Sequence, residues 1–292
     1  MVVAVVRSMR PRQWFKQVFV FPALLFSERF TDPRDVMLTL AAFGVLCLLS
    51  SSGYLFNDIL DVEADRSHPT KRNRPIASGA LTVPAAWALI ALLLVCGVGA
   101  SWFLGPAFLA SAVGYLAVTL SYSLWIKHVV LLDAMFLAGG FILRAVAGAE
   151  AIDVPISAWF LITTMFLALF LGFAKRSAEL RLMEGDATKS RKILAEYSSE
   201  LLGQLITVCA TGAILSYAIY TFDAARTRYL MVTVPMVVYG VFRYFYLIHR
   251  RSGGGAPELT LIRDPAMWIT GVLYAAAVIA VLVLIPGEAT VE

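Results

Sequence analysis

The sequence predicts an all-α polytopic membrane protein, and its composition and its apolar runs lead to this fold class. Of the 292 residues, 60% are hydrophobic and only 15% are charged. The apolar residues gather in repeated runs of about 20, which is the length that a helix needs to cross a bilayer. The three cysteines fall inside these runs without metal-type spacing, so we expect buried, inert thiols.

Nine spans follow one another along the chain. The first, at about residues 17–30, is short and is interrupted by Pro22. The others are expected at about 36–56, 84–104, 106–124, 129–149, 157–174, 202–222, 228–248 and 266–285. No linker or soluble segment separates them, so residues 1–292 are expected to form one membrane domain whose two ends lie on opposite sides.

The basic residues are distributed unevenly between the two sides of the membrane. Of the 24 Lys and Arg residues, 19 lie in the N-terminal segment or in connections on the same side. Cytosolic segments carry the excess of positive charge, so this side is expected to face the cytosol. The sequence thus predicts a multi-pass protein of the inner (plasma) membrane with a cytosolic N-terminus, an external C-terminus and a cytosolic working face. It contains no motif that reads DNA or RNA, so no nucleic-acid partner is expected.

An acidic motif opens the first long cytosolic loop. Asp58, Asp61 and Asp65 are spaced by three and then four residues, so a continuing helix would stack their carboxylates on one face. Such like charges suggest a compensating cation, and ligands that are all oxygen favour magnesium held between carboxylates and substrate phosphates. A solvated helix end is the alternative. It is disfavoured because the acids follow the apolar run 36–56 at the membrane edge, where ionisable groups are usually functional.

Basic residues follow this motif directly. Lys71, Arg72 and Arg74 lie between two prolines that prevent the helix from continuing smoothly. Cations suited to phosphate therefore lie beside carboxylates suited to a metal. This is the arrangement expected around a diphosphate.

Five further polar residues border or enter the spans. Lys16 belongs to a basic segment with a tryptophan, which is either an interfacial anchor alone or an anchor that also contacts a phosphate. Tyr122 and Lys127 close the fourth span, either as an interfacial tyrosine and a snorkelling lysine or as phosphate ligands, and Asp133 would orient Lys127. Arg144 lies well inside a span, where it either snorkels outward or pairs with an acid.

A second charged cluster follows the sixth span. Lys175 and Glu179 are four residues apart and Arg176 and Glu179 are three apart, so they share a face as the helix leaves the membrane. There they would border the same cytosolic cavity as the acids. The competing interpretation is an ordinary basic loop with ion pairs within one helix.

The run Asn57-Asp58-x-x-Asp61-x-x-x-Asp65, with nine spans, the Tyr122 and Lys127 pair and the second charged loop, resembles the UbiA superfamily of intramembrane prenyltransferases. The resemblance covers essentially the whole chain. It implies a UbiA-like bundle of nine transmembrane helices with cytosolic active-site loops and a lateral cavity for a lipid tail. It also implies magnesium as the cofactor, held by Asn57, Asp58, Asp61 and Asp65.

The second motif departs from the family's usual Asp-rich DxxxD pattern, because Lys175-Arg176-x-x-Glu179 stands in its place. With the N-terminal run Arg10-Pro11-Arg12-Gln13-Trp14-x-Lys16, the chain is similar to a branch of the superfamily with a different donor. There the donor is phosphoribosyl pyrophosphate and the acceptor is a polyprenyl phosphate, decaprenyl phosphate. The resemblance thus implies a magnesium-dependent pentosyltransferase that supplies a precursor of cell-wall arabinogalactan.

Roles for the remaining residues follow from this resemblance. Lys71, Arg72 and Arg74 would neutralise the pyrophosphate oxygens. Asp65 or Glu179 would orient the ribose hydroxyls. The 5-phosphate or the lipid phosphate would be bound by Lys175, Arg176 and Lys127.

Two other functions are compatible with parts of the sequence. An ordinary prenyltransferase that acts on an aromatic acceptor fits the fold and the first motif, and predicts turnover of prenyl diphosphate. A membrane transporter is disfavoured because the charges concentrate at one face instead of lining a continuous path. Membrane lipids are expected partners in every case, and the sequence is compatible with a homo-oligomer.

Overall fold

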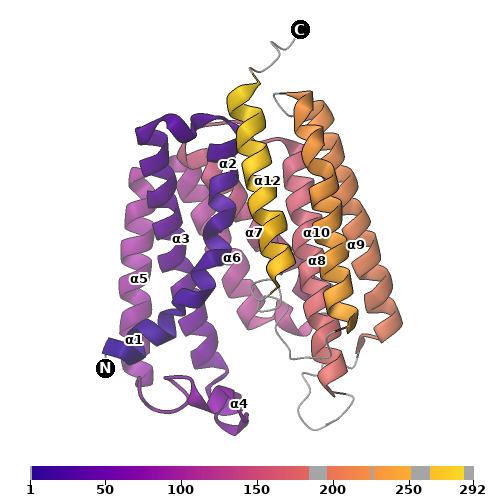
Figure 1. The fold of residues 1–292 in the computed structure, drawn as a ribbon. Coiled ribbons are helices and arrows are strands. Elements are labelled where there is room, and N and C mark those ends of the chain that lie inside the picture. Colours follow the sequence, from indigo (N-terminus) through magenta and orange to yellow (C-terminus); the bar gives the residue numbers. More distant parts are fainter. Residues whose placement is uncertain (1, 184–195, 225–226, 251–263, 286–292) are drawn as a thin grey trace. The chain divides into compact units, whose positions relative to one another are not determined.

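A computed structural model of the chain describes residues 2–183, 196–224, 227–250 and 264–285 (Figure 1). Within these ranges the regular structure is helical throughout and includes no β-strand. This confirms the predicted all-α fold class.

Eight segments of the described chain are helical, long and apolar enough to cross a membrane, so the chain is a multi-pass membrane protein. They match the second to the ninth predicted spans. The helices are α3 (Pro33–Leu60), α5 (Val83–Phe103), α6 (Pro106–Leu124), α7 (Leu132–Ala151), α8 (Ala158–Met183), α9 (Ser199–Ile219) continued by η7 (Tyr220–Ala224), η8 (Arg228–Thr233) continued by α10 (Val234–Arg250), and α12 (Pro265–Leu284).

The first predicted span is not a continuous helix, so the count of nine is not confirmed. The stretch at 17–30 consists of the end of the 3-10 helix η1 (Pro11–Val20), the six-residue helix α2 (Phe21–Phe26) and the start of η2 (Arg29–Thr31). Two features explain the interruption. Pro22 has no amide hydrogen to donate to a helix, and Glu28 has a left-handed backbone with φ of 60° that ends the second piece.

The chain divides into two compact units. The first comprises residues 1–127 and 139–155, and the second comprises residues 128–138 and 156–292. The expectation of one domain spanning the chain stays a prediction. Short elements complete the first unit and its connections: α1 (Val2–Met9), α4 (Val62–Ser67), η3 (Lys71–Asn73) and η4 (Ile126–His128).

In the first unit, α3 packs against α5 and α6, with α1 and η1 also along it (Figure 1). One apolar cluster joins α3 and α6 around Leu46, Leu49 and Phe108, which are fully buried. A second cluster, which includes Leu55 and Ile76, lies beneath the loop that follows the acidic motif. This packing fixes the membrane-edge end of α3, where the acids begin.

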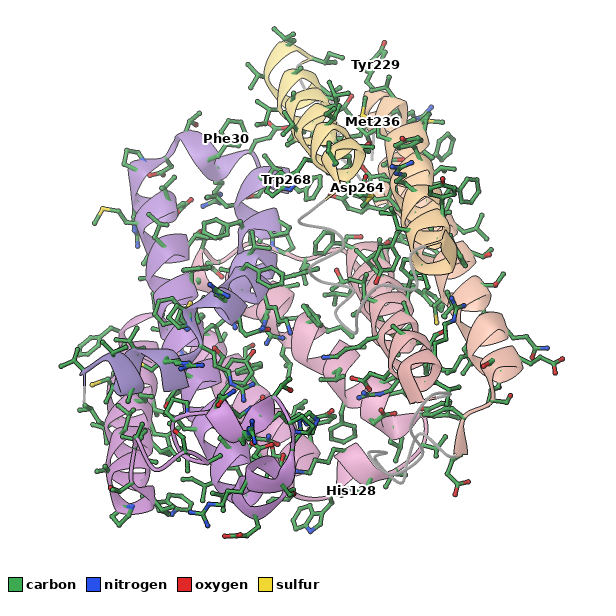
Figure 2. The ribbon with its side chains drawn as sticks, turned by 60° about the horizontal axis from the view of Figure 1, so that its bottom comes forward. Phe30, His128, Tyr229, Met236, Asp264 and Trp268 are labelled. Carbon is green, nitrogen blue, oxygen red and sulfur yellow. The ribbon has the colours of Figure 1, made fainter. Side chains whose placement is uncertain are left out.

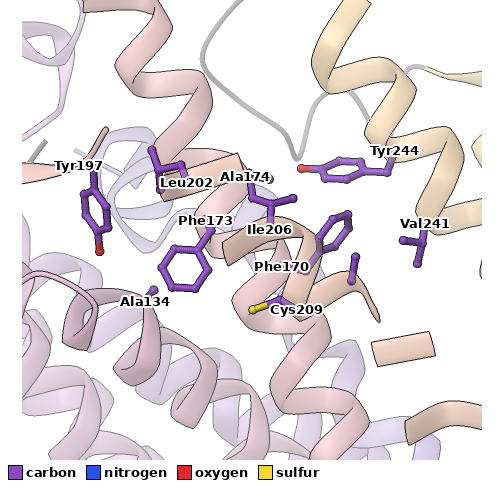
Figure 3. Packing of buried hydrophobic residues seen from close by; sticks show 11 residues of the cluster. Ala134, Phe170, Phe173, Ala174, Tyr197, Leu202, Ile206, Cys209, Val241 and Tyr244 are labelled. Carbon is purple, nitrogen blue, oxygen red and sulfur yellow. The ribbon is translucent and has the colours of Figure 1, made fainter. Parts of the chain in front are cut away.

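In the second unit, α8 packs along α9, and α10 packs against α12 and α9. Its core is aromatic: Phe170 lies edge-on to Tyr244, with their ring centroids 5.2 Å apart, beside Ile206 (Figure 3). Asp264 caps the first turn of α12 (Figure 2). Its carboxylate accepts from the Met267 amide at 3.1 Å and pairs with Arg243 at 2.9 Å.

Gly148 on α7 allows η1 to approach that helix closely. A Cβ atom at this position would overlap the backbone carbonyl of Val20. We therefore expect Gly148→Ala to destabilise the protein by about 1–3 kcal/mol, because a backbone segment must shift to relieve the overlap. The midpoint of thermal unfolding in detergent measures this effect. Gly139→Ala on the same helix is the matched control, because a Cβ there meets nothing within 4 Å. Equal midpoints for the two variants would contradict the packing.

Candidate active site

The acidic motif lies where α3 ends and α4 begins. Asn57 and Asp58 are on the last turn of α3, and Asp65 is on α4. Asp61 falls between the two helices, with φ of −94° and ψ of 8°, so the helix does not continue unbroken through the motif. The side chain of Asp61 is 31% exposed, whereas that of Asp58 is 3% exposed. The predicted stack of carboxylates on one helical face is therefore interrupted.

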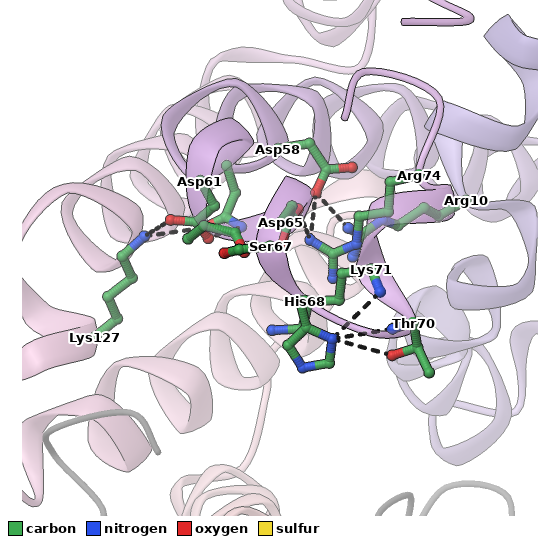
Figure 4. Close-up of polar contacts among 12 residues, drawn as sticks. Arg10, Asp58, Asp61, Asp65, Ser67, His68, Thr70, Lys71, Arg74 and Lys127 are labelled. Atoms are coloured by element: carbon green, nitrogen blue, oxygen red, sulfur yellow. Dashed lines mark hydrogen bonds and ion pairs between the residues drawn. The ribbon is translucent and has the colours of Figure 1, made fainter. Parts of the chain in front are cut away.

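Two buried acids share one arginine partner, and one of them has a second arginine (Figure 4). Arg74 Nη1 lies 3.0 Å from Asp58 Oδ1 and 2.6 Å from Asp65 Oδ2. Arg10 Nη2 lies 2.5 Å from the same oxygen of Asp58. The Arg10 guanidinium also lies over the ring of Tyr54, 5.1 Å from its centroid. Charge pairing of this kind offsets the cost of burying the carboxylates.

Asp61 belongs to a separate cluster. Its Oδ1 accepts from Lys127 Nζ at 2.8 Å (Figure 4). Its Oδ2 accepts from Asn57 Nδ2 at 2.9 Å. The predicted motif residues Asn57 and Asp61 and the predicted base Lys127 are thus brought together across 66 positions of sequence. In the described residues, no three acidic, histidine or cysteine side chains converge as a metal-binding group.

A cationic cavity of about 200 Å³ opens beside Asp58. Its lining residues are Arg7, Arg10, Asp58, Thr70, Lys71, Asn73, Arg74 and Pro75. Basic side chains outnumber acids four to one in this lining, so the charge of the cavity suits a multiply charged anion such as a phosphate.

The loop after α4 positions one of these bases. His68 Nδ1 lies 3.3 Å from the Thr70 amide and 3.4 Å from the Lys71 amide, so the imidazole accepts from the backbone that carries Lys71 (Figure 4).

The structure brings together some predicted site residues and not others. Lys71 and Arg74 line the cavity, whereas Lys16, Arg72 and Tyr122 do not. Sequence reasoning missed Arg7 and Arg10 as site residues. Arg10 could have been noticed because it belongs to the run Arg10-Pro11-Arg12-Gln13-Trp14, on which the family resemblance partly rests. Its contact with Asp58 could not be predicted, because the two residues are 48 positions apart in the sequence.

The second charged cluster belongs to the other unit and is built on α8. Arg176 is 3% exposed; its Nε lies 2.7 Å from Asp133 Oδ2, and its Nη1 lies 2.6 Å from Glu179 Oε2. The intrahelical ion pair of the competing interpretation is therefore present between Arg176 and Glu179. Asp133 was expected to orient Lys127, but it bonds Arg176 and Tyr197 instead. The reason is that Asp133 is fully buried on the face where α7 meets α8.

Tyr197 completes this network. Its hydroxyl donates to Asp133 Oδ1 at 2.9 Å and accepts from the Leu131 amide at 2.7 Å. Burial raises the pKa of Tyr197 to about 12, so the hydroxyl keeps its proton at neutral pH. Arg176 is thus held by Asp133 from α7 and by Glu179 on its own helix, and Tyr197 fixes Asp133 in turn.

Residues 18–264 match the model of the UbiA prenyltransferase family. The chain belongs to this family. Among curated relatives, the decaprenyl-phosphate phosphoribosyltransferase of Mycolicibacterium smegmatis is 37% identical, and the alignment covers 92% of this chain and 89% of that relative. The protein of that name from Corynebacterium glutamicum is 33% identical, and the alignment covers 96% of this chain and 87% of that relative.

Solved structures support the same fold. A UbiA homolog from Archaeoglobus fulgidus bound to GPP and Mg²⁺ superposes with a TM-score of 0.73. It is 18% identical and covers 95% of this chain and 99% of that one. The UbiA resemblance and the UbiA-like helical bundle expected from the sequence are confirmed.

Proposed function

We propose that this UbiA-family chain transfers the 5-phosphoribosyl group of phosphoribosyl pyrophosphate to decaprenyl phosphate and releases pyrophosphate. The observation that carries the proposal is the cavity beside Asp58, where Arg7, Arg10, Lys71 and Arg74 surround a space suited to a diphosphate. The names of the relatives at 33–37% identity support the donor and the acceptor.

The chemistry requires stabilisation of opposite charges. Breaking the bond between ribose C1 and the pyrophosphate oxygen builds positive charge on the sugar and negative charge on the leaving group. Fixed cations aimed at the leaving group are therefore expected to supply most of the catalysis. In this proposal Arg10, Lys71 and Arg74 neutralise the pyrophosphate oxygens. The acceptor phosphate is already an anion at neutral pH, so the reaction needs no strong general base.

Magnesium is the proposed cofactor, and the ligand chemistry of the acidic motif suits it, although the aspartates would have to leave their Arg and Lys partners to converge on the ion. The side chains of Asn57, Asp58, Asp61 and Asp65 offer oxygen ligands at one end of α3, and magnesium prefers oxygen. A divalent ion would neutralise charge on the pyrophosphate. Asp61 is the most accessible of the three aspartates. Of its two partners, Lys127 is able to contact a phosphate, and Asn57 offers an amide oxygen to a metal.

Roles for the other predicted bases are proposed from their positive charge. Lys127 and Lys175 are proposed to contact the 5-phosphate or the lipid phosphate. Arg176 is proposed to position Glu179, because the Arg176 guanidinium is already paired with Asp133 and Glu179. Binding of a phosphate by Arg176 stays a prediction that requires the release of one of these ion pairs.

The proposal places the reaction on the cytosolic face of the plasma membrane. Of the 24 Lys and Arg residues, 19 are expected on that side, and the donor is water-soluble. The lipid acceptor would enter sideways from the bilayer. Its product would feed the synthesis of cell-wall arabinogalactan.

A transfer assay with two donors tests this function. Purified protein in detergent receives either ribose-labelled phosphoribosyl pyrophosphate with decaprenyl phosphate, or prenyl diphosphate with an aromatic acceptor. We expect label to enter the lipid from the first donor, only when magnesium is present, and no product from the second. Product from the second donor alone would assign the chain to the ordinary prenyltransferases of its family.

A further inference from the structure

Arg144 is a buried base that the proposed chemistry does not use. It lies on α7, within a membrane-spanning helix, and is 6% exposed. Its Nε donates to Gln17 Oε1 at 2.7 Å and its Nη2 donates to the Tyr115 hydroxyl at 2.9 Å. The two alternatives left open by the sequence, snorkelling and pairing with an acid, are both wrong within the described residues. The guanidinium is buried, and its hydrogen-bond partners there are neutral.

The surroundings are built to hold this cation. A guanidinium in a membrane-spanning segment is costly unless nearby groups compensate for it. Here its central carbon lies 4.7 Å from the ring centroid of Tyr115 and 4.9 Å from that of Phe141, which supplies cation–π attraction. A Cβ at Gly140 would lie only 3.3 Å from Arg144 Nη1, so glycine leaves the space that the side chain fills.

The partner of Arg144 belongs to an element that needs external support. Gln17 is fully buried on η1, a ten-residue 3-10 helix. Runs of 3-10 helix longer than about four residues are uncommon because their hydrogen-bond geometry is poor. Three contacts fasten η1 to its neighbours. Trp14 Nε1 donates to Ser51 Oγ at 3.1 Å, Gln17 accepts from Arg144, and Val20 lies against Gly148.

Arg10, at the start of η1, lines the anion cavity. Arg10 precedes the helix with a left-handed backbone, φ of 54°, and its side chain reaches Asp58. We propose that Arg144 is a positioning residue: by holding Gln17 it fixes η1 and thereby presents Arg10 to the cavity. This inference rests on the proposed function only in taking that cavity as the pyrophosphate site.

A double-mutant cycle tests the coupling between these two arginines, which do not contact each other. The measured quantity is the dissociation constant of inorganic pyrophosphate, with magnesium, for the full-length protein in detergent. Arg144→Met and Arg10→Ala are each expected to raise it about tenfold, as loss of one charge-assisted hydrogen bond would. The double variant is expected to bind no more weakly than Arg10→Ala alone. Additive effects of the two substitutions would overturn the proposal, because Arg144 would then act independently of Arg10.

A second variant separates positioning from stability. Arg144→Met leaves Gln17 Oε1 buried without its donor, which destabilises the protein by itself. Gln17→Leu combined with Arg144→Met removes that unsatisfied group, so the midpoint of thermal unfolding should recover. We expect pyrophosphate binding to stay about tenfold weaker in this pair, because the polar tether of η1 is still absent. Recovery of binding together with stability would overturn the proposal. Because the cycle measures binding and the two-donor assay measures transfer, either can fail without the other.

Discussion

Asp61→Asn is expected to lower the rate of transfer at least about 100-fold while leaving the fold intact. Asparagine keeps the shape of the side chain and one acceptor oxygen, but it removes the negative charge that a divalent ion requires. The loss of the Lys127 ion pair should cost little stability, because partly exposed pairs contribute about 0–1 kcal/mol. The measurement is initial velocity at saturating donor and magnesium, beside the midpoint of thermal unfolding.

The control for this variant is Glu63→Gln on α4. Glu63 is 79% exposed and pairs with the exposed Arg66, so it offers an acid close in sequence that lies away from the cavity. Its substitution should change neither velocity nor stability. If Asp61→Asn kept more than a tenth of the parental velocity, the assignment of Asp61 to the metal would be wrong.

Arg74→Met is expected to cause the largest loss of stability among the cavity residues. Its guanidinium bridges Asp58 and Asp65, so its removal leaves Asp65, 4% exposed, without the ion pair that neutralises it. Breaking a fully buried pair costs about 3–5 kcal/mol, and we expect at least about 2 kcal/mol here because Arg74 is 26% exposed. The midpoint of thermal unfolding in detergent should fall by about 5 °C or more.

Two further variants identify the cause of this loss. Asp65→Asn combined with Arg74→Met should recover much of the stability, because the unpaired buried charge is gone. Arg66→Met removes an exposed arginine from the same segment and should leave the midpoint nearly unchanged. A double variant as unstable as Arg74→Met would show that packing of the Arg74 side chain, and not its charge, stabilises the loop.

Much of the candidate site was predicted from the local spacing of its charged residues. The three aspartates, the bases that follow them and the polar end of the fourth span were all recognisable, because membrane-edge charges after apolar runs are unusual. Their pairing was not predictable. Asp61 pairs with Lys127, whereas Asp58 and Asp65 pair with Arg74. These two sets of ion pairs depend on a helix break and on contacts between segments that are distant in sequence.

Other features required tertiary information. The position of Arg10 in the site depends on the left-handed turn before η1 and on the anchoring of η1 to α3 and α7. The pairing of Arg176 with Glu179 was visible in the sequence, but its second partner, the buried Asp133, was assigned to Lys127, so Arg176 was predicted to bind a phosphate. The segment 17–30 was apolar enough for a span, yet Pro22 and the turn at Glu28 divide it.

The most direct test of the central claim follows two labels of the donor at once. Phosphoribosyl pyrophosphate is prepared with one isotope in its 5-phosphate and another in its β-phosphate, and is incubated with the protein, magnesium and decaprenyl phosphate. The account predicts that the 5-phosphate label enters the lipid while the β-phosphate label leaves as pyrophosphate in equal amount. Appearance of the β-phosphate label in the lipid, or of neither label with protein shown to be folded, would contradict it.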